Sequence, residues 1–205
     1  MSPSHATGGF DFTHHVGRLC ADIAARLPDL NHVDMRKVAV RFCQVRKGVS
    51  YGTQASLTPL RFAHGERTTV RRGQTWTIQR VLDASGQEML YLLSFYLPRF
   101  LDRSLHDKLS TVFHELWHIS PLFDGDLRRL PGRCYAHGSN QQAFHAEMAP
   151  LVERWLALSP PEETYAFLRH DFRQLVERHG PVYGTRYPTP KLVRVDPPGK
   201  LRGPV

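Results

Sequence analysis

The sequence of 205 residues has little cysteine and no long apolar run. Cys20, Cys43 and Cys134 are widely spaced and form no C-x-x-C pair, which argues against a disulfide framework or a cysteine zinc site and favours a reducing compartment. The longest apolar run, residues 89–97, is too short to span a bilayer. The first 13 residues have no apolar core, so we expect no signal peptide, no membrane partner and a cytoplasmic location.

Internal repeats are also absent, and the composition is that of an ordinary soluble protein. Hydrophobic residues make up 41% and charged residues 22% of the chain. This length suits one domain with a full hydrophobic core, which we place at residues 1–180. Residues 181–205 contain six prolines and no helical period, so we expect an extended or disordered tail.

The net charge of +8 comes from 27 lysines and arginines against 19 acidic residues, and half of it lies in the tail. A basic tail could make weak contact with nucleic acid. A solvated tail without a dedicated partner is the simpler interpretation. The sequence has no separate zinc finger and no stripe of alternating aromatic and basic residues that would favour a nucleic-acid module.

Hydrophobic periodicity predicts an α+β fold. Apolar residues recur at helical spacing in some segments and alternate in others, and Gly or Pro often separates these segments. We expect helices over residues 12–27, 104–119 and 162–179, and another that starts near residue 140 and is kinked or restarted at Pro150. We expect strands over residues 38–43, 57–62, 75–82 and 88–96. The last two strands should form a hairpin with its turn at Asp83–Gly86. This order predicts a zincin-like layout with an N-terminal helix, a small, mostly antiparallel sheet, an active-site helix and C-terminal helices.

The most informative motif is His-Glu-x-x-His, formed by His114, Glu115 and His118. Its context favours a helix, because an apolar stripe recurs at helical spacing and consists of Leu105, Leu109, Val112, Leu116 and Ile119. Ser104, with Asp107 three residues later, resembles a capping box at the start of this helix, and Pro121 stops it after the motif.

Two histidines four residues apart on a helix can bind one Zn²⁺ through both imidazoles. Glu115 then lies next to the open coordination position and can act as general base toward a zinc-bound water. We therefore predict His114 and His118 as zinc ligands, Glu115 as a catalytic residue and hydrolysis of a peptide bond as the reaction. The expected partner is a protein or peptide substrate.

A catalytic zinc site usually has a third protein ligand, and the sequence offers several. Asp124 is six residues after His118, but Pro121 occupies a position where a sharp turn needs glycine, so Asp124 and its neighbours are more typical of a turn. His145 and Glu147 lie on the next predicted helix about 160° apart, so at most one of them can face the metal.

The motif, the segment Phe123–Arg129 and His137-Gly138 together resemble the phage metallopeptidase family, and more distantly the SprT/Spartan metallopeptidases. In these families a loop follows the motif, and the histidine of a His-Gly-x-x-Phe segment completes the site. The resemblance implies that His137 is the third ligand. The loop before His137 is longer here, and Phe144 follows it at a wider spacing than in the family.

Two further hypotheses concern function. Tyr135, next to His137, is a candidate catalytic residue that donates a hydrogen bond to the oxyanion, although it could equally be a packing residue. Besides a zinc metallopeptidase, the sequence allows a protease that acts on proteins attached to DNA, which the basic tail favours. It also allows a non-catalytic binding module stabilised by its metal, but the presence of Glu115 argues against this alternative.

Overall fold

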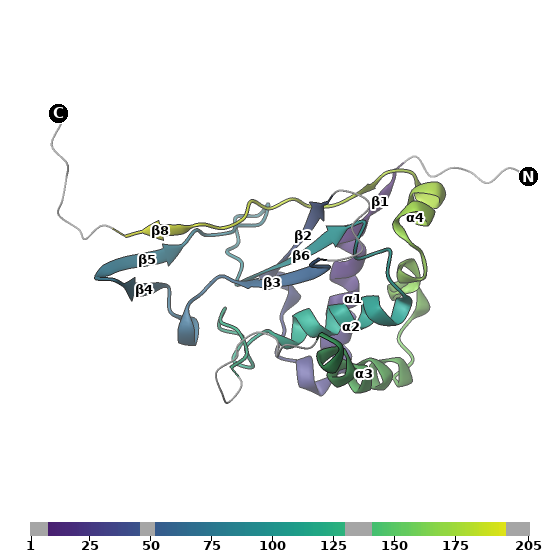
Figure 1. Ribbon diagram of the computed structural model, residues 1–205, viewed down its shortest axis with the longest axis horizontal. Coiled ribbons are helices and arrows are strands. Elements are labelled where there is room, and N and C mark those ends of the chain that lie inside the picture. The colour runs from purple at the N-terminus through teal and green to yellow at the C-terminus, as the bar shows by residue number, and fades with distance from the viewer. Residues whose placement is uncertain (1–7, 46–51, 130–140, 196–205) are drawn as a thin grey trace, which may run out of the picture.

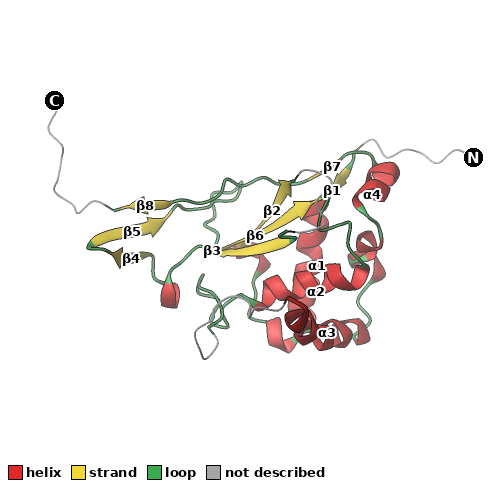
Figure 2. Cartoon of the chain, viewed as in Figure 1, coloured by secondary structure: helices red, strands yellow, loops and turns green. Residues whose placement is uncertain are grey.

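The computed structural model describes residues 8–45, 52–129 and 141–195, and for 141–147 the backbone alone. It shows a mixed α+β fold, as the sequence predicts, in which the long helices lie on one side of a small central sheet (Figure 1, Figure 2). Within these ranges, no helix has the length and apolar character needed to cross a membrane.

The central sheet has the strand order β2 (Val38–Gln44), β6 (Tyr91–Leu97), β3 (Ala55–Pro59). β6 pairs parallel with β2 and antiparallel with β3. The expectation of a mostly antiparallel sheet is therefore wrong for this sheet, which is mixed. Because both faces of β6 are covered by other parts of the chain, the strand is almost wholly buried, and such burial suits parallel pairing.

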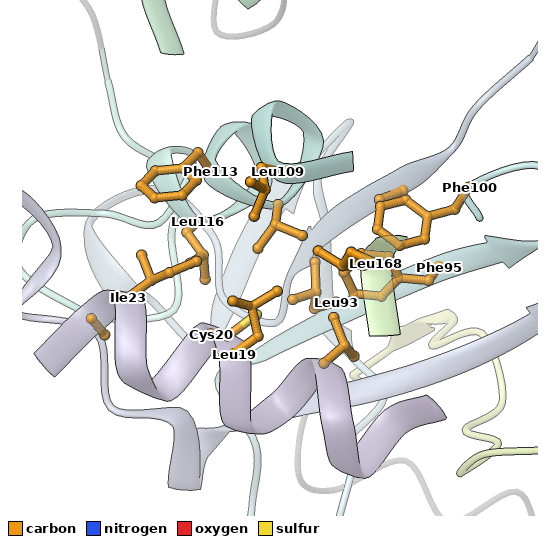
Figure 3. Packing of buried hydrophobic residues seen from close by; sticks show 14 of the residues in the cluster. Leu19, Cys20, Ile23, Leu93, Phe95, Phe100, Leu109, Phe113, Leu116 and Leu168 are labelled. Atoms are coloured by element: carbon orange, nitrogen blue, oxygen red, sulfur yellow. The ribbon is translucent and has the colours of Figure 1, made fainter. Parts of the chain in front are cut away.

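The main hydrophobic core lies between the sheet and two helices, α1 (Phe12–Arg26) and α2 (Leu105–Trp117). The prediction of an N-terminal helix is confirmed, and its N-cap is Asp11, whose side chain accepts a hydrogen bond from the backbone N–H of His14. Figure 3 shows the side chains of both helices meeting those of β6 and of Phe100 and Leu168. The two helices are thus fixed against one face of the sheet.

A smaller apolar cluster covers the opposite face, and its buried members are Ala39, Leu60, Val81, Met89 and Leu92. The turn at Asp83–Gly86 forms as predicted, with a hydrogen bond of 3.0 Å from Gly86 N to Asp83 O and a bridge between Leu82 and Glu88. The predicted hairpin ladder does not form. The strand before the turn, β5 (Gln74–Ile78), joins a different sheet from β6, because each finds more pairing partners elsewhere.

That second sheet contains β4 (Thr68–Arg71), β5 and β8 (Leu192–Arg194), all antiparallel, in this order. It extends beyond the central sheet at the left of Figure 1. β8 comes from the segment expected to be an extended or disordered tail, and so does β7 (Val182–Tyr183), which pairs in parallel with β1 (Phe10–Asp11). Residues 181–195 are thus attached to the domain at two places; residues 196–205 lie outside the described part of the chain.

The sequence predicts two C-terminal helical segments. The first forms as α3 (Gln141–Ala157), which continues through Pro150 without a restart. The second, expected over 162–179, is not one helix but is divided into two 3₁₀ turns and a shorter helix. α4 (Phe172–His179) begins at a capping box in which Asp171 and Gln174 bond each other's backbone N–H, and this local cap sets a new helix start. The 3₁₀ turns are η1 (Pro28–Leu30), η2 (Met35–Lys37), η3 (Ala63–Gly65), η4 (Glu162–Thr164) and η5 (Ala166–Arg169).

Candidate metal and catalytic site

Helix α2 carries the motif and is held in place by its start and by its apolar stripe. Ser104 Oγ accepts a hydrogen bond of 3.1 Å from Asp107 N, so the predicted N-cap is confirmed. Four residues of the predicted apolar stripe, Leu109, Val112, Leu116 and Ile119, are at most 1% exposed, and the first, Leu105, is partly buried. The helix ends at Trp117, and His118 is its C-cap. The motif therefore lies on the last turn of a firmly packed helix.

The structure brings His114 and His118 together. Their Nε2 atoms are 2.9 Å apart, and the ring planes are nearly perpendicular, at 80°. His114 is buried, at 8% exposed, and His118 is partly buried. Two ring nitrogens that approach the same point in a half-buried place are donors of the kind that transition metals bind.

Glu115 lies beside this pair and is almost fully buried, at 7% exposed. Its carboxylate accepts a hydrogen bond from the backbone N–H of Leu57 on β3. Burial raises the pKa of Glu115 to about 7, because removal from water penalises the charged form more than the Leu57 hydrogen bond favours it. A carboxyl group with a pKa near neutral can both accept and return a proton at the pH of a cell.

The histidine pair fits zinc. Two nitrogens that ligate one tetrahedral zinc at 2.0–2.1 Å lie about 3.3 Å apart. The observed 2.9 Å between the Nε2 atoms is within a few tenths of an ångström of that value. Within the described ranges, no group of three or more His, Cys, Asp or Glu side chains is placed to hold a metal, so a metal bound here would take two ligands from this pair and need others from elsewhere.

Asp124 does not join the histidine pair in a three-residue group. Its Oδ1 instead accepts a hydrogen bond of 3.1 Å from Asp126 N, which is the turn that the sequence predicts for this segment. Gly125, between them, has φ +89°, and a Cβ there would lie 2.5 Å from Arg61 Cγ. The turn therefore needs glycine at this position, both for its backbone angle and for the close approach of Arg61.

The loop after the motif is fastened to the sheet by Tyr91, a residue that the sequence analysis did not single out. The Tyr91 hydroxyl donates to Asp126 O at 2.9 Å and accepts from Gly125 N at 3.0 Å. Tyr91 is fully buried, and this burial raises its pKa to about 12, so the hydroxyl stays protonated. Nothing in the local sequence distinguishes this tyrosine from an ordinary core residue.

Arg128 closes the end of α2. Its backbone N–H donates to His118 O at 2.7 Å, its Nε donates to Trp117 O at 2.6 Å, and its guanidinium lies 4.0 Å from the centre of the Trp117 ring. The sequence analysis did not single out Arg128. Its position shortly after the end of a helix could have indicated this role, because helix C-termini carry unpaired carbonyls and a partial negative charge that attract cations.

β3 is an edge strand of the central sheet and lies against α2. Gln54 O and Leu60 N bond to β6, so the alternate residues Ala55, Leu57 and Pro59 direct their backbone groups to the outer edge. Leu57 lies at the middle of this edge, where its N–H reaches Glu115. Among the described residues no strand pairs with this outer edge, which runs directly past the candidate general base.

The remaining predicted site residues lie outside the described part of the structure. These are Tyr135 and His137, and the side chains of His145 and Glu147. No family model, no curated protein and no solved structure matches the chain.

Proposed function

We propose that the protein is a zinc-dependent metallopeptidase. The observation that carries the proposal is the 2.9 Å approach of His114 Nε2 to His118 Nε2 on the same helix as buried Glu115. Two imidazoles that share a metal, with a carboxyl group adjacent in sequence, are the arrangement that zinc hydrolases use. The sequence resemblance supplies His137 as the third ligand in this proposal.

The residues divide the chemistry between them. His114 and His118 would hold a zinc ion, which supplies Lewis acidity to a substrate carbonyl and makes water more acidic. Glu115 takes the proton from the attacking water and passes it to the amine that leaves when the peptide bond breaks. In the metal-free protein burial raises the pKa of Glu115 to about 7, and the positive charge of a bound zinc ion would lower it from there toward the ionised form that a base needs.

The open edge of β3 supports a peptide as the substrate. An extended peptide can pair with an exposed strand edge through main-chain hydrogen bonds. Such a peptide would run along Ala55, Leu57 and Pro59, and its backbone would pass Glu115, which Leu57 contacts. Pro59 has no N–H to donate, and the Leu57 N–H already bonds Glu115, so a paired peptide would depend on the Ala55 N–H and on the outward carbonyl groups.

Metal content and peptide hydrolysis, measured on three proteins, test the proposal. We expect one zinc per chain in the wild type and in Glu115→Gln, and loss of zinc in His118→Ala, by mass spectrometry of the purified proteins. Hydrolysis of a fluorogenic casein should occur only in the wild type. A wild type that retains zinc yet cleaves nothing would indicate the non-catalytic module, and a wild type without zinc would overturn the proposal.

The third ligand is tested separately with His137→Ala, His145→Ala and Glu147→Gln. Because the proposal names His137, only His137→Ala should lower zinc content. Far-ultraviolet circular dichroism of each variant shows whether the fold survives. Zinc loss in His145→Ala or Glu147→Gln instead, with a native spectrum, would transfer the third position to that residue.

A further inference from the structure

The net positive charge is concentrated around the second sheet, away from the motif. Residues 61–80 contain five arginines and one acidic residue, and residues 181–195 contain three cations and no acidic residue. These two segments, which hold β4, β5 and β8, therefore account for +7 of the net charge of +8. Such concentration produces a strong local positive potential.

The strand register places four of the eight cations in these two segments on one face of the sheet. Side chains alternate between the two faces of a strand. Trp76 pairs with Thr69 and Arg194, and Gln74 pairs with Arg71, so Arg71, Trp76 and Arg194 share one face. Arg67 and Arg80 continue the same alternation just beyond the strand ends, and both reach Glu88. We call these five residues the basic face.

The opposite face carries no charge at its strand positions. Its strand residues and the adjoining Val195 are valine or threonine, namely Thr68, Val70, Thr75, Thr77, Val193 and Val195. Just beyond the strand ends, Arg72 and Lys191 fall on this opposite side by the same alternation, so the basic face holds four cations against two. This excess is a reason to look for a ligand of the basic face.

The acidic residue nearest this face does not neutralise it. Glu88 pairs with Arg61 at 2.8 Å, Arg67 at 3.4 Å and Arg80 at 3.3 Å, so one carboxylate serves three guanidinium groups. Arg67 and Arg80 keep 68% and 62% of their side chains exposed. No ion pair among the described residues involves Arg71.

We propose that the basic face binds the phosphate backbone of a nucleic acid. Arginine recognises phosphate with two parallel hydrogen bonds, and every cation of this face is arginine. Arg67 and Arg71, four residues apart in extended chain, are separated by about 13 Å along the strand, so the two side chains can contact different phosphates of one nucleic-acid strand. Trp76, among the arginines, offers a ring on which an unpaired base can stack.

This site differs from the basic tail considered in the sequence analysis, because three of its four arginines lie between β3 and β6 and only Arg194 belongs to the tail. It is also independent of the proposed peptidase activity, since none of the five residues belongs to the motif or to the loop that follows it. Binding to nucleic acid can therefore fail while zinc binding and hydrolysis succeed, and the reverse.

Fluorescence anisotropy with a labelled 20-nucleotide DNA, single-stranded and as a duplex, tests the proposal between 50 and 200 mM KCl. The test variant is Arg71→Gln/Arg194→Gln. The matched control, Arg18→Gln/Arg178→Gln, removes the same charge from exposed positions on α1 and α4. We expect the test variant to bind at least tenfold more weakly than the wild type at 100 mM KCl, and the control less than twofold.

The salt dependence gives a second readout. Loss of two phosphate contacts should reduce the slope of log K against log salt by about 1.8 for the duplex or about 1.4 for the single strand. Tighter binding of the single strand assigns a role to Trp76, and tighter binding of the duplex restricts the site to phosphate contacts; both support the proposal. Absence of salt-dependent binding, equal losses in test and control variants, or equally effective competition by polyglutamate would overturn it.

Discussion

The backbone N–H of Leu57, on edge strand β3, donates a hydrogen bond to the carboxyl group of Glu115, on helix α2. This contact joins the strand that is open for pairing to the residue proposed as general base. The hydrogen bond favours the charged carboxylate, whereas burial favours the neutral acid, and burial has the larger effect. The pKa of about 7 is the balance of these two effects.

The raised pKa of Glu115 predicts a pH dependence of stability in the metal-free protein. The folded-state pKa of about 7 lies above the ordinary glutamate value of 4.5, so the stabilisation is fully present below pH 4.5 and is lost as the pH rises through 7. The loss amounts to at most about 3 kcal/mol. Glu115→Gln has no such loss, so its free energy of unfolding should exceed that of the wild type at pH 8.

Urea denaturation in the presence of a chelator, from pH 5 to pH 8, measures this difference. We expect the advantage of Glu115→Gln to shrink steadily toward pH 5. A difference that does not change with pH would mean that the folded-state pKa of Glu115 is close to its ordinary value.

Arg128 should position His118 for metal binding. Replacement by Gln removes the 2.6 Å hydrogen bond to Trp117 O and the contact with the Trp117 ring, which leaves the last turn of α2 less well held. Mutation of a group that holds a metal ligand in its orientation typically lowers metal affinity by about 10–100-fold. We expect Arg128→Gln to raise the zinc dissociation constant about tenfold, measured by competition with a chromogenic chelator.

The stability of the metal-free Arg128→Gln variant separates this role from a general weakening of the fold. Arg128→Lys keeps the charge but loses the planar guanidinium, and it should recover part of the affinity. Unchanged zinc affinity in Arg128→Gln would show that the last turn of α2 holds its position without this residue.

Gly125→Ala should destabilise the loop after the motif more than a glycine substitution elsewhere. Gly125 has φ +89°, and its added Cβ would lie 2.5 Å from Arg61 Cγ. The control is Gly73→Ala, because Gly73 has φ +68° with nothing within 4 Å of the added Cβ, and so carries the backbone strain alone. That strain is about 1–2 kcal/mol. Thermal unfolding of both variants should show the larger loss for Gly125→Ala, and equal losses would mean that Arg61 moves aside freely.

Tyr91→Phe should also destabilise the protein, by about 1–3 kcal/mol, because it leaves two buried backbone groups without their partner. These groups are Gly125 N and Asp126 O. Tyr96→Phe is the control on the same strand, where the hydroxyl has one long contact of 3.4 Å with Ser56 Oγ. Chemical denaturation that ranks Tyr96→Phe as the more damaging change would contradict this account of the loop.

Several elements follow from local sequence alone. α1 and α2 begin and end near the predicted residues because their caps and apolar stripes lie within the segment itself: Asp11 bonds His14 N, and Ser104 bonds Asp107 N. The turn at Asp83–Gly86 is local in the same way. The proximity of His114 and His118 is a property of helical spacing, so the centre of the candidate site could be derived before the fold was known.

The errors concern pairing between distant segments. The strands on either side of Asp83–Gly86 look like a hairpin in sequence, yet β6 pairs with β2 and β3, and β5 with β4 and β8. Strand pairing depends on which distant edge buries more apolar surface, and a single segment does not contain that information. The prediction of one continuous helix over 162–179 is wrong for a local reason, because the capping box at Asp171 starts a new helix there.

The sequence by itself determined the motif, the helix that carries it and the type of metal ligand, because these depend on residues within a few turns of one helix. Only the tertiary structure decided the environment of Glu115, the support of the loop by Tyr91 and Arg128, and the placement of four arginines on one sheet face. Each of these depends on burial or on contact between segments far apart in the chain. Such contacts arise only when the whole core is assembled, so no local pattern records them.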